Sequence, residues 1–297
     1  MKLVMLSSKK YAEEGKDYGD CTIIDTGTNV IIYDCGSEEH AKEVEFYLNK
    51  YGYDKALVIL SHNDADHFAG LPYLISNDRI KSITTLLLLK HVAEILGEMD
   101  DGRRSIESVK RHIGEYFDNV KTLSGNNLND AMDDTLMLDP CINIVGPDHD
   151  FIIEAVAKAL DESESDMIAA ETIVNAISVQ VEVIVGNHKL LLTGDAAFDA
   201  IKDKVREYDA IQLPHHGKFK QASEIFELNK GRNSDVIYLV SDNKYNHNGG
   251  SEELMNSDEK MGKDIRNTQF EEILLDINSF TKKNKGIYGY EIHHIEF

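Results

Sequence analysis

The densest group of side chains that could do chemistry lies at residues 61–67, directly after the apolar run at residues 56–60. The group consists of His62, Asp64, Asp66 and His67. A strand would send alternate side chains to opposite faces, whereas a loop at the end of a strand can turn several toward one point. Mixed imidazole and carboxylate ligands suit zinc, manganese or iron, and this loop carries enough of them for two metal ions. A polar surface turn with an Asx motif is the alternative, but this pattern after an apolar strand favours a metal site.

Three later apolar segments also end in histidine or aspartate. Residues 190–192 lead into Thr193-Gly194-Asp195, residues 211–213 lead through Pro214 to His215 and His216, and residues 236–240 precede a loop that carries His247. Each segment alone says little, since an acid after glycine is often a helix cap and a lone histidine is usually structural. Together, four apolar strands that deliver such residues at the same end predict one convergent site.

The elements that must position these residues follow from the spacing of apolar side chains. Strands are expected at residues 22–24, 30–34, 56–60, 83–89, 136–145, 178–185, 188–192, 210–213, 236–240 and 287–292. Helices are expected at residues 38–50, 104–120, 151–160, 197–206 and 251–262. Short strands and interleaved helices in two similar halves predict a mixed α/β (α+β) fold, with two sheets packed face to face and helices outside. The chain has only four prolines and no low-complexity linker, so we expect a single domain over residues 1–297.

The charge of the chain limits its partners. Its 297 residues include 53 acidic and 31 basic side chains, a formal net charge of −22. A protein that binds duplex DNA through its general surface needs a basic face, and here the basic residues form only short pairs such as Lys9–Lys10, Arg103–Arg104 and Lys282–Lys283. Either the substrate is not a long polyanion, or metal ions and a few lysines attract it, or a partner supplies the basic surface.

The hydropathy and the cysteines of the chain indicate the cellular compartment of the protein. No run approaches the roughly 20 apolar residues of a membrane span, and residues 1–8 lack the apolar stretch and cleavage site of a secretory signal. Cys21, Cys35 and Cys141 lie too far apart for a disulfide framework or a zinc site made of cysteines alone. We therefore expect a cytoplasmic protein with no membrane partner.

The order of the motifs resembles the metallo-β-lactamase superfamily. It runs His-x-Asp-x-Asp-His, then Thr-Gly-Asp, then His-His-Gly, then a distal histidine. The likeness is strongest to the branch that contains the nuclease-like domain of ComEC-type DNA-uptake proteins. Residues 19–24 and 31–36, together with Asn175, Ser178 and Thr268, extend it over about residues 18–270. The resemblance implies a four-layer αββα sandwich with the site at one edge of the two sheets.

The resemblance also implies roles for individual residues. His62 and Asp64 would hold one of two divalent metal ions, Asp66 and His67 would hold the other, and Asp195 would bridge both.

The remaining histidines leave one choice open. His247 matches the last ligand position, while His215 and His216 match a pair that lies beside the metals in related phosphodiesterases and touches the scissile phosphate. Spacing does not decide whether His216 or His247 binds metal.

Two departures from the family pattern concern the first metal. Asp64 stands where the commoner pattern has histidine, and a carboxylate there shifts the preference from zinc toward manganese or magnesium. The middle histidine ligand of many members has no clear counterpart, and His149, after Gly146-Pro147-Asp148, is the candidate. The expected cofactors are thus two divalent metal ions, zinc or manganese.

The leading functional hypothesis is metal-dependent hydrolysis of a phosphodiester, with nucleic acid, DNA above all, as substrate. Two metal ions can lower the pKa of a bridging water from ~15.7 toward ~7. Asp66 can orient the resulting hydroxide, and His215 or His216 can bond the phosphate or protonate the leaving oxygen. Lys218 and Lys220 are candidate phosphate contacts, with a solvated turn as the alternative. A single strand entering a metal-lined groove would need fewer cationic contacts than a duplex.

Two further hypotheses stay open. The substrate can instead be a small phosphodiester, such as a cyclic nucleotide or a choline phosphoester, because esterases of that type share the His-His-Gly pattern. Alternatively, the chain is a subunit whose partner, another protein or a second copy, gates the site. The helix expected at residues 104–120 and the polar stretch at residues 121–134 would then form the docking surface, unless the helix simply covers the core.

Overall fold

A computed structural model describes residues 1–11, 16–99, 105–116, 123, 125, 127–161, 167–168, 171–244 and 250–281. Three predictions fall outside these residues: the strand at residues 287–292, the ends of the helix at residues 104–120, and the ligand His247.

The described strands form two large sheets and one small one. The first large sheet has seven strands in the order β15-β1-β2-β3-β4-β5-β6, with β1 Lys2–Met5, β2 Cys21–Asp25, β3 Val30–Cys35, β4 Ala56–Ile59, β5 Ile80–Thr85, β6 Leu128–Asp130 and β15 Ile273–Leu275. The second has six strands in the order β14-β13-β12-β11-β10-β7, with β7 Ile142–Gly146, β10 Gln180–Val185, β11 His188–Leu192, β12 Ala210–Gln212, β13 Ile237–Val240 and β14 Asp264–Asn267. The small sheet pairs β8 Met167–Ile168 with β9 Glu171–Thr172.

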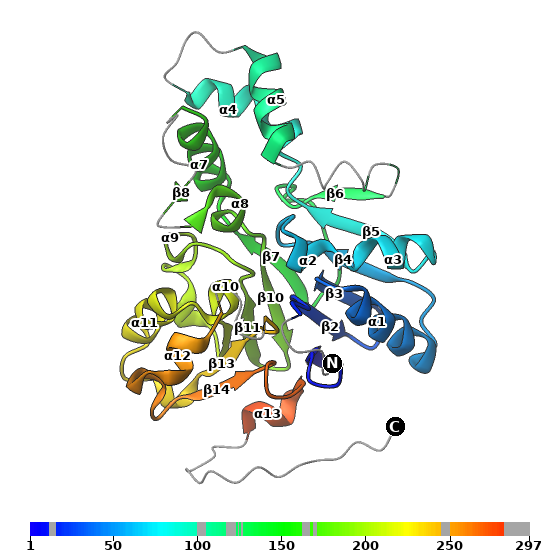
Figure 1. The fold of residues 1–297 in the computed structure, drawn as a ribbon, viewed down its shortest axis with the longest axis vertical. Coiled ribbons are helices and arrows are strands. Elements are labelled where there is room, and N and C mark those ends of the chain that lie inside the picture. Colours follow the sequence, from blue (N-terminus) through cyan, green and yellow to red (C-terminus); the bar gives the residue numbers. More distant parts are fainter. Residues whose placement is uncertain are drawn as a thin grey trace.

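Helices cover the outer faces of both large sheets (Figure 1). Among the described residues, the α-helices are α1 Glu38–Tyr51, α2 Ala65–Phe68, α3 Leu71–Ser76, α4 Val92–Glu98, α5 Ile106–Tyr116, α7 His149–Asp161, α8 Ile173–Ala176, α9 Phe198–Ile201, α10 Pro214–Gly217, α11 Phe219–Leu228, α12 Glu252–Asn256 and α13 Ile277–Thr281. Short 3-10 helices are η1 Leu88–Lys90, η2 Val205–Glu207, η3 Asn233–Asp235 and η4 Asp258–Lys260. In Figure 1, α1 and α3 lie beside the first sheet, and α11 and α12 lie beside the second.

Side chains that point alternately to the two faces of each strand form the hydrophobic core between the layers. In β3, Ile31 and Tyr33 join a cluster that also holds Leu190 and Leu192 of β11, so the two sheets pack on each other. The intervening Ile32 packs instead with α1 and α3. Because side chains of a strand point alternately to its two faces, each buried strand serves both an inner and an outer layer. The four-layer αββα sandwich is thereby confirmed.

The direction of the strands sets the edge where functional residues gather. In the first sheet β3, β4, β5 and β6 run parallel, and in the second β11, β12, β13 and β14 do so. Parallel neighbours end at the same edge, and ligand sites of α/β sheets lie beyond the carboxyl ends of the strands.

Several predicted elements have different bounds. The strand predicted at residues 136–145 begins only at Ile142, because the preceding residues form turns around Asp139. The loop predicted to begin at residue 61 contains the short helix α2, and the segment at residues 83–89 is strand only to Thr85. Strands β1, β14 and β15 were not predicted; β14 and β15 lie at the edges of their sheets, and β1 lies between β15 and β2.

Candidate functional site

Histidines and aspartates from three segments meet around the buried side chain of Asp195, which follows β11. Its Oδ2 lies 4.0 Å from Nε2 of His62 and 3.5 Å from Nε2 of His216, and its Oδ1 lies 3.4 Å from Nε2 of His67. We call His62, Asp64, Asp66, His67, Asp195 and His216 the central cluster.

The other two carboxylates of the central cluster flank these imidazoles. Oδ2 of Asp64 lies 3.7 Å from Nε2 of His62, and Oδ2 of Asp66 lies 3.1 Å from Nε2 of His216. The predicted convergence of the segments after β4, β11 and β12 is therefore present in the structure.

Glycines allow the loop that carries Asp66 to lie against the first sheet. The carbonyl oxygen of Asp66 accepts a hydrogen bond from the backbone N–H of Asp20 at 2.8 Å. A Cβ atom on Gly36 would lie 2.0 Å from this oxygen, and one on Gly19, whose φ is +63°, would lie 1.9 Å from it. Only glycine permits so close an approach, which explains these residues of the 19–24 and 31–36 motifs.

Buried hydrogen bonds orient the histidines. Oδ2 of Asp34, at the end of β3, lies 2.8 Å from Nδ1 of His67, so that Nε2 of this imidazole points at Asp195. Oδ1 of Asp20 lies 3.1 Å from Nδ1 of His216 in the same way. Carboxylates on the remote ring nitrogen are the usual partners of metal-binding histidines, because they fix the ring and raise its basicity.

Hydroxyl groups hold the remaining histidine. Nδ1 of His62 lies 3.0 Å from Oγ of Ser61 and 3.2 Å from Oγ of Ser178. Asn175 completes this side of the site, since its Nδ2 donates to Oδ2 of Asp195 at 3.4 Å. Asn175 and Ser178 thus contact the central cluster, a role that their place in the sequence did not indicate.

The central cluster has the features of a metal site. Nε2 of His62, His67 and His216 and Oδ1 of Asp195 are buried and make no hydrogen bond of good geometry among the described residues, although the nearest charged partners lie only 3.1–4.0 Å away. Polar atoms buried in this way are costly unless something pairs with them. His62, His67 and Asp195 offer ligand atoms that lie within 4.8 Å of one another, as do Asp20, His67 and His216. Divalent cations therefore fit the donor atoms that this site presents.

Burial and charge shift the pKa values in opposite directions across the site. Burial, with a smaller effect from His67, lowers the pKa of His62 to about 3. Burial alone would also lower the pKa of His67, but Asp195 and Asp34 outweigh it and raise that pKa well above its ordinary value. The neutral imidazole and the ionised carboxylates are the forms that bind cations.

His215 lies beside the central cluster and has its own carboxylate partner. Its Nε2 lies 3.8 Å from Oδ2 of Asp195, and its Nδ1 lies 2.6 Å from Oε2 of Glu171 at the start of β9. His215 and His216 have φ values of +51° and +56°, in the left-handed region that non-glycine residues rarely occupy. Such backbone strain is concentrated at functional sites, and here it points consecutive imidazoles toward one carboxylate.

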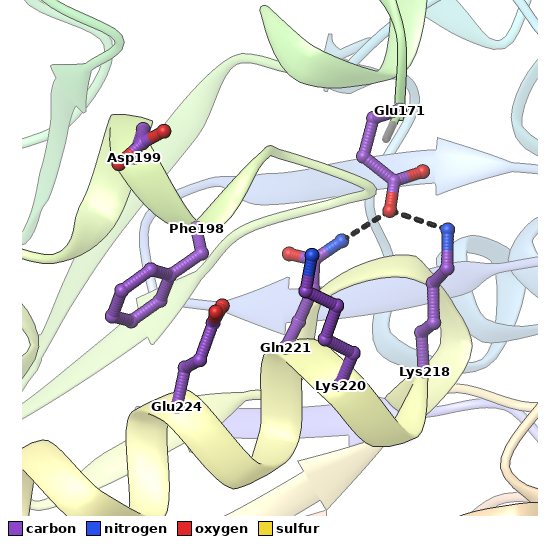
Figure 2. Close-up of a pocket in the computed structure, with 7 residues that line it drawn as sticks. All are labelled: Glu171, Phe198, Asp199, Lys218, Lys220, Gln221 and Glu224. Atoms are coloured by element: carbon purple, nitrogen blue, oxygen red, sulfur yellow. Dashed lines mark hydrogen bonds and ion pairs between the residues drawn. The ribbon is translucent and has the colours of Figure 1, made fainter. Parts of the chain in front are cut away.

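The predicted phosphate contact Lys218 pairs with the same glutamate. Figure 2 shows Oε1 of Glu171 between Nζ of Lys218 and Nε2 of Gln221, each at 2.6 Å. These residues line a pocket of about 150 Å³, together with Phe198, Asp199, Lys220 and Glu224. The pocket therefore adjoins the site through Glu171, and a substrate contact by Lys218 stays a prediction.

Lys244 is a cation at the site that the sequence did not reveal. It follows β13, its side chain is 11% exposed, and its Nζ lies 2.5 Å from Oδ2 of Asp66. Burial would lower the pKa of Lys244, but Asp66 and Asp195 outweigh it and raise this pKa. Its position after an apolar strand, three residues before His247, was the available signal.

His149 lies in a different group of side chains. Its Nε2 lies 3.0 Å from Oε2 of Glu94, and its ring lies near that of His91. The interpretation of His149 as the missing ligand is therefore wrong, because α7 begins at this residue and places it against α4. Asn175 contacts Asp195 instead.

The described part of the chain contains no helix with both the length and the apolar character needed to cross a membrane. The cytoplasmic location stays a prediction.

Solved structures with little sequence identity resemble the chain. The metallo-beta-lactamase fold protein YhfI from Bacillus subtilis is 13% identical with a TM-score of 0.49, covering 92% of this chain and 98% of that one. Tm1679, described as a metal-dependent hydrolase of the beta-lactamase superfamily, is 15% identical with a TM-score of 0.49, covering 93% and 99%. The short form of human tRNase Z is 12% identical with a TM-score of 0.37, covering 80% and 91%. No curated protein matches the sequence.

A family profile gives the decisive match. The profile described as the metallo-beta-lactamase superfamily matches residues 15–241, well over half of the chain, and this range includes all of the central cluster. The chain therefore belongs to the metallo-β-lactamase superfamily and is a metal-dependent hydrolase of this fold.

Proposed function

We propose that the chain hydrolyses phosphodiester bonds with two divalent metal ions, zinc or manganese, and that nucleic acid, DNA above all, is its leading substrate. The observation that carries this proposal is the buried ammonium group of Lys244 beside the central cluster. A chain with a net charge of −22 keeps the ammonium group of Lys244 inside its site, where an anionic substrate would enter.

The central cluster would hold the metals. His62 lies near Asp64 and Asp195, His67 lies near Asp195, and His216 lies near both Asp66 and Asp195. This arrangement supports His216 as the last ligand, while His247 lies outside the described residues. When bound, the metals supply an activated water and accept charge from a phosphoryl oxygen.

The side chains around the central cluster would serve the substrate. Asp66 is ionised: burial would raise its pKa, but His67, His216 and Lys244 outweigh it and lower that pKa. It can therefore orient a water as well as bind metal. Glu171 holds Nδ1 of His215, so Nε2 is left to contact a phosphate oxygen or to protonate the leaving oxygen.

Lys244 would neutralise the phosphate. Its ammonium is a compact point charge, and it already lies among the carboxylates where a phosphoryl group would bind. A substrate phosphate can share this charge with Asp66. The cation that serves the substrate is then Lys244 more directly than Lys218, which is paired with Glu171.

The resemblance to the ComEC-type branch supports nucleic acid as the substrate, and the net charge of −22 favours a single strand over a duplex. The same net charge favours a second candidate, a small phosphodiester such as a cyclic nucleotide or a choline phosphoester. Neither needs an extended basic surface.

The test combines metal analysis with a choice of substrates. The metal content of freshly purified protein should be at least two divalent ions per chain. Labelled single- and double-stranded oligonucleotides with added manganese or zinc are then compared with bis-p-nitrophenyl phosphate. Cleavage of oligonucleotides supports the nuclease, and cleavage of the small ester alone supports the second candidate.

Variants connect the activity to the central cluster. Asp66→Ala and Asp195→Ala should abolish turnover and reduce the metal content while the circular dichroism spectrum stays native. His188→Ala is the control, because this histidine, at the start of β11, pairs with Asp209 and does not belong to the central cluster. Full activity in either aspartate variant would contradict the assignment. Inactivity of the wild type with every metal and substrate would favour a subunit that depends on a partner.

A further inference from the structure

A second group of potential ligands lies outside the central cluster, where η1 and α4 meet the start of α7. Nδ1 of His91 lies 3.1 Å from Oε1 of Glu94, and Nε2 of His149 lies 3.0 Å from Oε2 of the same carboxylate. One donor atom from each residue can be chosen so that all three lie within 4.8 Å of one another.

We propose that His91, Glu94 and His149 bind a further divalent transition-metal ion, zinc by preference, that fastens α4 to α7. Two imidazoles and one carboxylate form a ligand set that suits zinc and leaves a fourth position for water. We call these three residues the peripheral site. The proposal does not depend on the proposed function, since it concerns residues outside the central cluster.

The distances between the ligand atoms of the peripheral site suit a metal ion after small movements of the side chains. Ligands at 2.0–2.1 Å around a tetrahedral zinc ion lie about 3.3 Å from one another. Both carboxylate contacts already approach this value. The side chains of Glu94 and His149 are about half exposed, so they can adjust to close the remaining gap.

Asp130 orients His91 in the manner expected of a metal ligand. Its Oδ2 lies 3.0 Å from Nε2 of His91, which leaves Nδ1 to face Glu94. The carboxylate is itself fixed, because its Oδ1 accepts hydrogen bonds from the backbone N–H groups of Leu87 and Met132. A carboxylate on the remote nitrogen fixes the orientation and tautomer of a metal-binding imidazole.

Other charged groups around the peripheral site leave it net acidic. Nδ1 of His149 lies 3.6 Å from Oδ1 of Asp150, and Nζ of Lys90 lies 3.8 Å from Oδ2 of Asp130. Glu94, Asp130 and Asp150 therefore face one lysine and two imidazoles. A divalent cation would balance this excess of carboxylate charge.

The peripheral site lies at the same sheet edge as the central cluster. Asp130 ends β6, which is two strands from β4 in the first sheet, and His149 follows β7 of the second. A metal there would join segments that follow the two different sheets. In Figure 1, α4 and α5 lie at one end of the molecule above α7, so the metal would anchor this end.

The test counts metal in the full-length protein without using turnover. Metal-stripped wild type is dialysed to equilibrium against buffered free zinc, and bound zinc is measured by plasma mass spectrometry. Glu94→Gln and His149→Ala should each bind one zinc ion fewer than the wild type. His188→Ala, which alters a surface histidine with a single carboxylate partner, should bind the same number as the wild type.

Amide hydrogen exchange shows which helices are stabilised when zinc binds to the peripheral site. Zinc should slow exchange in α4 and in the first turn of α7 of the wild type, and this protection should be lost in Glu94→Gln. Wild-type zinc content in both variants would overturn the proposal, as would zinc protection of α4 that persists in Glu94→Gln. Because both substitutions lie outside the central cluster, a failure here is distinguishable from a failure of the proposed hydrolase activity.

Discussion

Nζ of Lys244 lies 2.5 Å from Oδ2 of Asp66, which joins the loop after β13 in the second sheet to α2 beside the first. The ammonium group is thereby held among Asp66, Asp195 and the nearby Asp17, whose carboxylates raise its pKa against the effect of burial. A permanent cation at this place gives an acidic protein a point of attraction for an anionic substrate.

Removal of this cation should weaken catalysis. Lys244→Met is expected to lower kcat/KM for a phosphodiester by about 10²-fold, the usual effect of losing one group that stabilises charge in the transition state. Lys244→Arg should recover part of the loss. Steady-state kinetics measure both variants, with Lys189→Met as control because Lys189 pairs with Glu182 on the β10–β11 hairpin. An unchanged kcat/KM in Lys244→Met would show that the ammonium serves only the fold.

Glu171 should act by positioning His215. Glu171→Gln keeps the size of the side chain but removes the charge that faces Nδ1 of His215, and we expect kcat to fall by about 10- to 100-fold with a smaller change in KM. Kinetics over a range of pH should also show a changed profile. Glu224→Gln, in the same pocket, is the matched control (Figure 2). Equal effects of the two substitutions would argue against a positioning role.

The backbone contact at Gly36 should be intolerant of any side chain. Gly36→Ala places a methyl group 2.0 Å from the carbonyl oxygen of Asp66, so the loop must move, and a displacement of about 1 Å at a catalytic group costs about 10²-fold in rate. Turnover and metal content should both fall. Gly97→Ala in α4 is the control, since its added Cβ meets no atom within 4 Å. Normal turnover in Gly36→Ala would contradict the packing described above.

The buried His40 should make stability depend on pH. Burial lowers its pKa to about 4 from an ordinary value of 6.5, and neither ring nitrogen has a hydrogen-bond partner among the described residues. The unfolded chain therefore takes up a proton below pH 6.5 that the folded chain refuses until about pH 4. Stability from this group is present above pH 6.5 and is lost as the pH falls between these values.

The measurement compares unfolding by urea at pH 7 and pH 5 in the presence of a chelator. Between these two conditions, the wild type should lose about 2 kcal/mol more free energy of unfolding than His40→Leu, because one pKa unit corresponds to about 1.4 kcal/mol. The chelator removes the contribution of metal release. The same pH dependence in both proteins would show that His40 does not titrate in this range.

Much of the fold could be predicted because it depends on local patterns. The hairpins that became β2–β3 and β10–β11, and the helix that became α1, follow from periods of two and 3.6 residues. The short strands β1, β14 and β15 could not be found in this way. Leu3 of β1 pairs with Leu275 of β15 from the other end of the chain, and such pairing leaves little trace in either segment.

The sequence by itself determined which strand ends carry the histidines and aspartates of the central cluster. His62, Asp195 and His216 each follow an apolar strand, and parallel strands bring such ends together whatever their order along the chain. The type of residue then restricted the chemistry to cation binding and proton transfer.

Only the tertiary structure decided which of these residues touch. The pairs Lys244–Asp66 and Glu171–His215, and the separation of His149 from the central cluster, depend on how two sheets and their loops are placed. These residues are far apart in the sequence, and no periodic pattern of apolar residues relates one to another. Distances of a few ångströms between them arise only when the hydrophobic cores of the layers have fixed every strand end in space.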